Sequence, residues 1–141
     1  MTTIRENIIA TVITNLTNTT GVGNRIYRSR TAFVARAETP AIIVEPVEDN
    51  PSSNTSLPTL DWELLLRCVV YIRSDTADID ADPVIESLHS KIMADLTLNG
   101  YAQDIMPSKV AFEFVDADKP AAVITCDYLV RYRTNNDSLS S

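Results

Sequence analysis

The stretch TLDWELLLRCVVYIR (Thr59–Arg73) decides the fold class, because its side chains alternate in character along its whole length. Every even-numbered position is apolar, whereas the odd-numbered positions mix Leu65, Val69 and Tyr71 with acidic residues and arginines. Strict alternation predicts a strand with one buried face. At about 3.4 Å per residue this strand would extend for roughly 50 Å, so we expect it to bend or to project from the domain with its first half.

The end of the chain, VITCDYLVRYRT (123–134), repeats the alternation. Its odd-numbered face again combines apolar Val123 and Leu129 with Asp127 and two arginines. A face that meets only water is almost uniformly polar, whereas apolar residues interspersed with arginine are typical of subunit interfaces. Either other protein copies or helices of the same chain cover these mixed faces, and both interpretations stay open. The candidate interface residues on the two strands are Arg67, Tyr71, Arg131 and Arg133.

Two amphipathic helices accompany the strands. Apolar residues at helical spacing predict the first helix over 3–16, where Thr3 and Glu6 form a capping box. The second helix is predicted to begin at Asp82 and Pro83, which are residue types that suit a helix N-terminus.

Further strands are predicted at 41–47, at 109–115 and, as a short piece that a loop follows, within 25–39. Long strands joined by turns favour an α+β fold with a mainly antiparallel sheet of about four to five strands. A mixed sheet is the alternative, and both principal helices are expected on one face. We expect a single domain over 1–134 with an exposed loop at 48–58, followed by a flexible tail at 135–141.

The chain has 141 residues and a net charge of −7, from 12 Lys and Arg against 19 Asp and Glu. The length suits one domain. The negative charge repels phosphate backbones, so we expect no sequence-specific nucleic-acid binding. No apolar run approaches the ~20 residues of a membrane helix, and the polar N-terminus with Glu6 is unlike a signal peptide. We therefore expect a soluble protein that is made inside the cell and has no membrane partner.

The sequence predicts no catalytic, cofactor-binding or metal-binding residues. A catalytic base needs a reacting group within hydrogen-bond reach, and nothing in the sequence points one at His89, the only histidine. Asp78, Asp80 and Asp82 have the spacing of a calcium loop, but Pro83 stands where the sharp turn needs glycine. We expect a boundary histidine and a solvated acidic helix start.

The two cysteines, Cys68 and Cys126, occupy apolar-face positions of predicted strands. We expect both to be buried free thiols. A disulfide is possible only if their strands lie side by side.

One basic cluster interrupts the acidic chain, in the segment RIYRSRTAFVAR at 25–36. Glutamates follow it closely. Three interpretations stay open for the cluster: a solvent-facing loop, a protein interface and a nucleic-acid contact. A contact with the acidic surface of a second copy fits the charge balance better than nucleic acid does. The cluster adds Arg25, Arg28, Arg30 and Arg36 to the candidate interface residues.

The order of these segments resembles that of the tail terminator, or tail-completion, proteins of long-tailed bacteriophages, of the minor tail protein U type. The similarity extends over nearly the full length. The segments that carry it are RIYRSRTAFVARAETPAIIVEP, CVVYIRSD, ADPVIESLHSKIMADLTLNGYAQDI and VAFEFVDADKPAAVITCDYLVRYRT. The last is the most characteristic, because an acidic turn with Lys-Pro-Ala leads into a strand that ends on an aromatic residue between arginines.

The resemblance implies a structural role without catalysis. Terminators form a ring, commonly a hexamer, that caps the finished tail tube, stops tube growth and offers a surface to the head. The implied partners are further copies of the chain, the tail tube protein, the head–tail connector or neck protein and, in a contractile tail, the sheath. The implied location is the head-proximal end of the tail in the virion, after assembly in the host cytoplasm. The segments 25–36 and 48–58 are implied contacts with neighbours or tube.

Two other classes of function remain. One is another head–tail connector, neck or tube-like phage protein. The other is a small ligand-binding or enzymatic α+β domain, which would usually be a monomer or dimer. The mass of the protein in solution separates that class from a ring.

Overall fold

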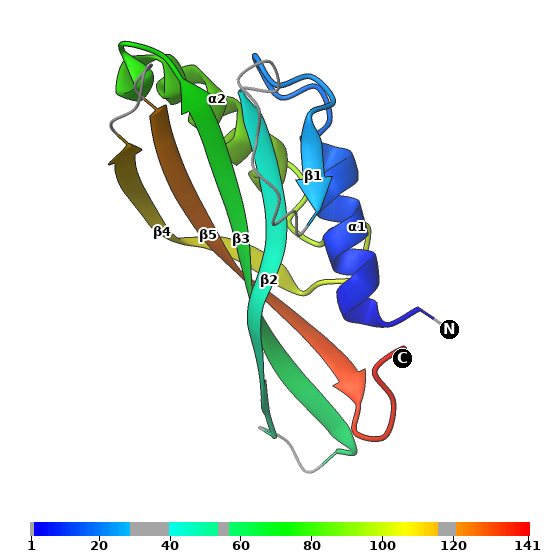
Figure 1. Cartoon of the computed structure of the whole chain (residues 1–141). Helices are drawn as coiled ribbons and strands as arrows, with labels where there is room; N and C mark the ends of the chain where they lie inside the picture. The colour runs from blue at the N-terminus through cyan, green and yellow to red at the C-terminus, as the bar shows by residue number, and fades with distance from the viewer. Residues whose placement is uncertain (1, 29–39, 54–56, 116–120) are drawn as a thin grey trace.

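The structure of the chain, a computed structural model, describes residues 2–28, 40–53, 57–115 and 121–141. Within these residues it contains two helices and five strands (Figure 1). In chain order they are α1 (Ile4–Leu16), β1 (Ile26–Arg28), β2 (Ala41–Ser52), β3 (Thr59–Arg73), α2 (Ala77–Met93), β4 (Asp104–Val115) and β5 (Ala121–Asn135). The predicted α+β class is thus confirmed.

All five strands form one sheet in the order β1-β2-β3-β5-β4. The short β1 runs parallel to β2, whereas the other three neighbouring pairs are antiparallel. The sheet is therefore mixed, which was the stated alternative to a purely antiparallel one. The long strands β3 and β5 occupy its middle and pair without interruption from Thr59 opposite Asn135 to Arg73 opposite Ala121.

The core lies on the even-numbered face of β3 and β5. Leu64, Cys68 and Ile124 are fully buried there, as the alternating pattern predicted. Buried residues of both helices, among them Ile8 of α1 and Leu88 of α2, belong to the same hydrophobic cluster. Burial of this apolar surface is the main source of stability, at about 25 cal/mol per Å² removed from water.

Helix α1 begins as predicted. Thr3 is its N-cap, and the Thr3 hydroxyl accepts a hydrogen bond of 3.1 Å from the Glu6 amide. This contact satisfies one of the free amides of the first turn. The second half of the predicted capping box is replaced, because the Glu6 carboxylate binds the Arg28 guanidinium of β1 instead.

Helix α2 begins earlier than the sequence suggested. Its first residue is Ala77 rather than Asp82 or Pro83, so Pro83 lies inside the helix. The Asp80 carboxylate accepts hydrogen bonds from the Ser74 and Thr76 hydroxyls just before the helix, which ties the preceding turn to the first helical turns. The acidic residues that resembled a calcium loop are therefore helical.

The hairpin of β2 and β3 extends past the helical layer (Figure 1). The expected exposed loop at 48–58 is wrong for its first part, because residues 48–52 belong to β2 and pair with β3. A register shift at Pro46/Glu48 marks a bulge that bends the strand there. Polar composition and prolines suggested a loop, but this part of β2 lies beyond the core, where strands carry few apolar residues.

Aromatic and polar contacts anchor this hairpin to the rest of the molecule. The ring of Trp62 stacks on that of Tyr132 with centroids 6.1 Å apart, and the Trp62 indole N–H donates to the Thr134 hydroxyl at 2.9 Å. The Tyr132 hydroxyl donates to the Asp49 carboxylate, which also lies 3.5 Å from the Arg5 guanidinium. The base of the hairpin is thereby connected to α1.

Two boundaries near the end of the chain differ from expectation. Strand β4 begins at Asp104 instead of 109, with a register shift at Pro107/Lys109. Proline is tolerated there because β4 is an edge strand and because the backbone N–H that proline lacks is not needed for pairing at a bulge. The segment predicted as a flexible tail makes hydrogen bonds: Asn135 ends β5, and the Leu139 carbonyl accepts from the Ile4 amide at 2.9 Å.

Candidate assembly surfaces

The odd-numbered face of β3 and β5 carries charged side chains in cross-strand pairs, and we call it the ladder face. The antiparallel register places Asp61 opposite Arg133 and Glu63 opposite Arg131. The Arg133 Nε lies 2.7 Å from Asp61, and the Arg131 Nε lies 3.7 Å from Glu63. Both predicted interface arginines are thus paired within the chain, and about half of each side chain remains exposed, 50% for Arg131 and 46% for Arg133.

The pair of Arg67 and Asp127 on the same face is more buried. The guanidinium donates two hydrogen bonds to the carboxylate, at 3.0 and 3.3 Å, and the Asp127 side chain is only 6% exposed. The hydrogen bond that the guanidinium donates to the Asp127 carboxylate raises the pKa of Arg67 above its ordinary value. A buried carboxylate needs such a partner, because an unpaired one would carry a desolvation cost of several kcal/mol. Arg67 therefore stabilises the buried Asp127 carboxylate, while part of its own side chain remains exposed.

Tyr71 belongs to a small apolar cluster on the ladder face. It packs with Tyr27 and Val123 against buried Ile43 and Val69. The predicted interface tyrosine is thus half-buried in its own chain, and its surroundings are apolar rather than charged.

The arginine cluster is only partly described. The Arg25 guanidinium donates to the Gly21 carbonyl at 2.7 Å and to the Pro40 carbonyl at 2.9 Å, which fixes the starts of β1 and β2 together. Arg28 pairs with Glu6, and this hydrogen bond lowers the pKa of the Glu6 carboxyl. The other two arginines of the cluster, Arg30 and Arg36, lie outside the described residues.

A surface that the sequence analysis did not single out lies on the edge strand β4. Val110, Phe112 and Phe114 are 49%, 53% and 61% exposed, and we call them the β4 stripe. They lie on the same face of the sheet as the core, because Phe112 pairs in register with Ile124. Aromatic residues that are exposed together on a rigid strand are typical of protein interfaces. Their alternation was visible in the sequence, but the edge position of β4 was not.

A groove of about 220 Å³ separates the β4 stripe from α2. Its apolar lining includes Ile85 of α2, Val110 of β4 and Cys126 of β5. Its charged and polar lining consists of Asp82, Glu86, His89, Lys109, Asp127 and Tyr128. We call it the α2–β4 groove.

Two polar groups inside this groove, those of His89 and Tyr128, pair with each other. The His89 Nδ1 lies 2.9 Å from the Tyr128 hydroxyl, and the two rings stack with centroids 6.0 Å apart. Burial raises the pKa of Tyr128 well above its usual range, so this hydroxyl stays protonated. The histidine is half-buried at a boundary, and the groove presents no activated nucleophile beside it.

The two cysteines lie directly opposite each other on β3 and β5. Their strands are therefore side by side, which was the condition for a possible disulfide. Both are free thiols in the structure and are almost fully buried. Burial raises the pKa of Cys126 to about 11 and that of Cys68 further. The thiolate forms are therefore absent near neutral pH, and neither thiol is activated as a nucleophile.

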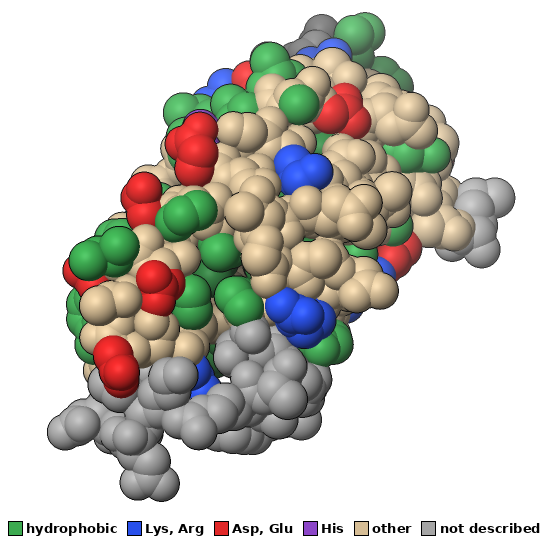
Figure 2. All heavy atoms as spheres, turned by 90° about the horizontal axis from the view of Figure 1, so that it is seen from above, with side chains coloured by type: hydrophobic (Ala, Val, Ile, Leu, Met, Phe, Trp, Pro, Cys, Tyr) green, Lys and Arg blue, Asp and Glu red, His purple; other side chains and the backbone are tan. Residues whose placement is uncertain are grey.

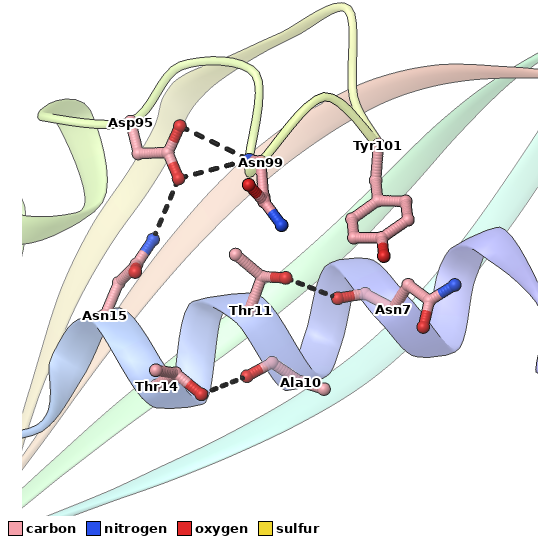
Figure 3. A pocket seen from close by; sticks show the side chains of 8 residues that line it. All are labelled: Asn7, Ala10, Thr11, Thr14, Asn15, Asp95, Asn99 and Tyr101. Carbon is pink, nitrogen blue, oxygen red and sulfur yellow. Dashed lines mark hydrogen bonds between the residues drawn. The ribbon is translucent and has the colours of Figure 1, made fainter.

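A second groove, of about 390 Å³, separates α1 from the segment after α2 (Figure 3). Its only carboxylate, Asp95, accepts hydrogen bonds from the Asn15 side chain and the Asn99 amide. The Thr11 and Thr14 hydroxyls donate to carbonyls of their own helix. Most of the lining residues are polar, and the hydrogen bonds of Asp95, Asn15, Thr11 and Thr14 are made within the chain.

Charge and metal chemistry give no further site within the described ranges. Figure 2 shows acidic and basic side chains dispersed over the upper face, with hydrophobic side chains between them and no broad basic patch. No three His, Cys, Asp or Glu side chains among the described residues gather closely enough to hold a metal ion. Neither described helix has the length and apolar character needed to cross a lipid bilayer.

Comparison with known proteins identifies one family. The family model described as phage minor tail protein U matches residues 2–132. The match covers all seven described helices and strands except the last residues of β5. No curated protein matches the chain.

Proposed function

The chain belongs to the phage minor tail protein U family and is a structural component of the virion tail, and from this premise we propose that copies of it form a ring, a hexamer, that caps the tail tube. The ring ends tube polymerisation and provides the surface to which the head attaches. Its partners are the tail tube protein and the connector or neck protein, and also the sheath if the tail contracts. It acts at the head-proximal end of the tail, after assembly in the host cytoplasm.

The exposed β4 stripe carries this proposal. A closed ring needs a head-to-tail contact, in which two different surfaces of the chain meet and a repeated rotation returns to the first copy. The β4 stripe provides one apolar surface at one end of the sheet. Exposed arginines on the ladder face, Arg131 and Arg133, offer charged contacts elsewhere on the molecule.

Termination then requires occupancy and no chemistry. The ring binds the growing tube end and presents an outer face that does not fit another tube subunit, so growth stops by exclusion. The rigid sheet supports this role, because an interface on packed strands keeps its shape better than one on loops. The groups with perturbed pKa values are accounted for by burial and by internal pairs, which favours a structural role over the alternative of a small enzyme.

Tube assembly in the presence of the chain tests this function. Tail tube protein is polymerised with and without the purified chain, and tube lengths are measured by electron microscopy. We expect shorter tubes with additional density at one end, because the ring occupies the growing end of the tube. An unchanged length distribution with bare tube ends would overturn the proposal.

A further inference from the structure

The α2–β4 groove has the chemistry of a binding site for an apolar segment with basic ends. Ile85 and Val110 give it apolar walls, and the β4 stripe continues this surface outward. On the α2 side its rim is acidic, from exposed Asp82 and Glu86. Among the described residues of the lining, Lys109 is the one Lys or Arg, so the carboxylates of the α2 rim give this lining an excess of negative charge.

The open edge of β4 adds backbone groups to this surface. Among the described strands, β4 is the last in the order of the sheet. An extended segment that lies against an edge strand gains main-chain hydrogen bonds, while alternate side chains fill adjoining pockets. The groove therefore suits a strand-like ligand better than a helix.

The chain itself contains a segment of matching composition, RTAFVAR at 30–36. Four apolar residues stand between Arg30 and Arg36, and one of them, Phe33, is the only phenylalanine outside the β4 stripe. In extended form these seven residues span roughly 20 Å. In an extended segment Ala32 and Val34 share a face with both arginines, so these two apolar residues can lie against the groove while an arginine meets the acidic rim of α2. Phe33 would point to the opposite face.

Its own groove is too distant for this segment to fill. The segment leaves β1 after Arg28 and returns to the start of β2 at Ala41, and these strands form the sheet edge opposite β4. Four strand spacings of about 4.8 Å separate β1 from β4, or roughly 19 Å. The stretch between Arg28 and Ala41 can extend for roughly 40 Å. Reaching β4 and returning to β2 would use all of this length. The segment of a neighbouring copy would not have to cross the sheet, if the β1 edge of that copy lies next to the β4 edge of the first copy.

We propose that the α2–β4 groove of one copy binds residues 30–36 of the neighbouring copy, so that each copy gives one segment and receives one. This inference rests on the proposed ring and specifies its subunit contact. The contact is head-to-tail, since the strands that flank the segment in the chain, β1 and β2, lie at the side of the sheet opposite β4 and the groove. It closes into a ring when the repeated rotation between neighbours returns to the first copy without a shift along the axis.

Site-specific photo-crosslinking tests the contact. A benzophenone amino acid replaces Phe112, and a matched variant carries it at Leu96, which is 47% exposed away from the groove. Equal amounts of ¹⁵N-labelled and unlabelled protein are mixed, assembled and irradiated, and mass spectrometry identifies the joined peptides. We expect the probe at 112 to join residues 30–36 of a differently labelled copy, and the probe at 96 not to. Rings whose probe at 112 joins another segment, or only its own copy, would overturn the proposed contact while leaving the ring intact.

Charge exchange gives a second readout. Arg36→Glu and Glu86→Arg should each weaken self-association by about fivefold to tenfold, and the double variant should recover most of it. The control double variant combines Arg36→Glu with Glu113→Arg. Glu113 lies on the same strand as the β4 stripe but faces the ladder side. Circular dichroism establishes that each variant is folded. Failure of the double variant to recover, or equal recovery with Glu113→Arg, would contradict the contact. A wild-type chain that never associates, even beside tube ends, would overturn the ring and the contact together.

Discussion

Phe112 and Ile124 lie opposite each other on β4 and β5, yet Ile124 is fully buried whereas Phe112 is 53% exposed. Both side chains point to the same side of the sheet, since directly paired residues share a face. The core ends between them. The apolar character of the sheet surface continues past the part that the described helices cover, and a second copy would remove this remainder from water.

Replacement of Phe112 should separate assembly from folding. Phe112→Ser removes exposed apolar surface, so we expect the free energy of unfolding to change by less than about 0.5 kcal/mol. Self-association, measured by sedimentation velocity, should weaken by at least about tenfold, because aromatic residues dominate interface energies. Leu96→Ser is the matched control and should leave association unchanged. Equal association of both variants with the wild type would contradict an interface at the β4 stripe.

Charge reversal at the exposed end of the ladder face should also impair assembly more than folding. Arg131→Glu loses a pair that is half-exposed and contributes at most about 1 kcal/mol. Combining it with Glu63→Arg restores the internal pair with opposite orientation. We expect ring formation to stay weak in the double variant, because the charged contact with a partner would depend on which strand carries the positive charge. Normal assembly of the single Arg131→Glu or Arg133→Glu variant would show that these residues serve only their own chain.

Arg67 should behave differently from these two arginines. Arg67→Met leaves the Asp127 carboxylate buried without its two hydrogen bonds, so we expect a loss of about 2–3 kcal/mol in the free energy of unfolding. Arg131→Met should lose no more than about 1 kcal/mol, because its pair with Glu63 is half-exposed. Denaturant titrations of both variants measure the contrast. Equal losses would mean that the burial of Asp127 has no energetic consequence.

The carboxyl of Asp49 should give the fold a pH dependence. Burial raises the pKa of Asp49, against the opposing effects of the hydrogen bond from Tyr132 and the charge of Arg5. Because the folded-state pKa lies above the unfolded-state value, the folded chain holds this proton more tightly. Stability relative to the unfolded chain is therefore gained as the pH falls through the raised pKa, and it is complete below the unfolded value.

Asp49→Asn isolates this contribution, since the amide does not titrate. The free energy of unfolding of the wild type minus that of the variant should increase between neutral pH and about pH 4. Thermal unfolding at several pH values measures it. A difference that stays constant or decreases as the pH falls over this range would show that the charged form of Asp49 does not destabilise the folded chain.

Residue alternation was sufficient to predict the two central strands and their core face. Leu64, Cys68 and Ile124 are buried because an even-numbered position of β3 or β5 can face only one side of the sheet. The start of α1 was also predictable, since the Thr3 cap depends on three neighbouring residues alone. These features are local, and local sequence determines them.

Features that depend on strand order or register were not predictable in this way. The exposure of Phe112 follows from the position of β4 at the sheet edge. The pairing of Arg133 with Asp61 follows from the register of β5 against β3. The extension of β2 through 48–52 follows from its partner strand, because the stretch has no alternation of its own. In each case a segment distant in sequence decides the outcome.

The most direct test of the proposed ring is negative-stain electron microscopy of the purified chain, alone over a range of concentrations and mixed with tail tubes. The proposed ring, in which neighbouring copies would cover the apolar residues of the sheet edge, predicts closed rings with six-fold symmetry, in solution or seated on one end of each tube. Particles that stay monomeric at every concentration, beside tube ends that stay bare, would contradict it.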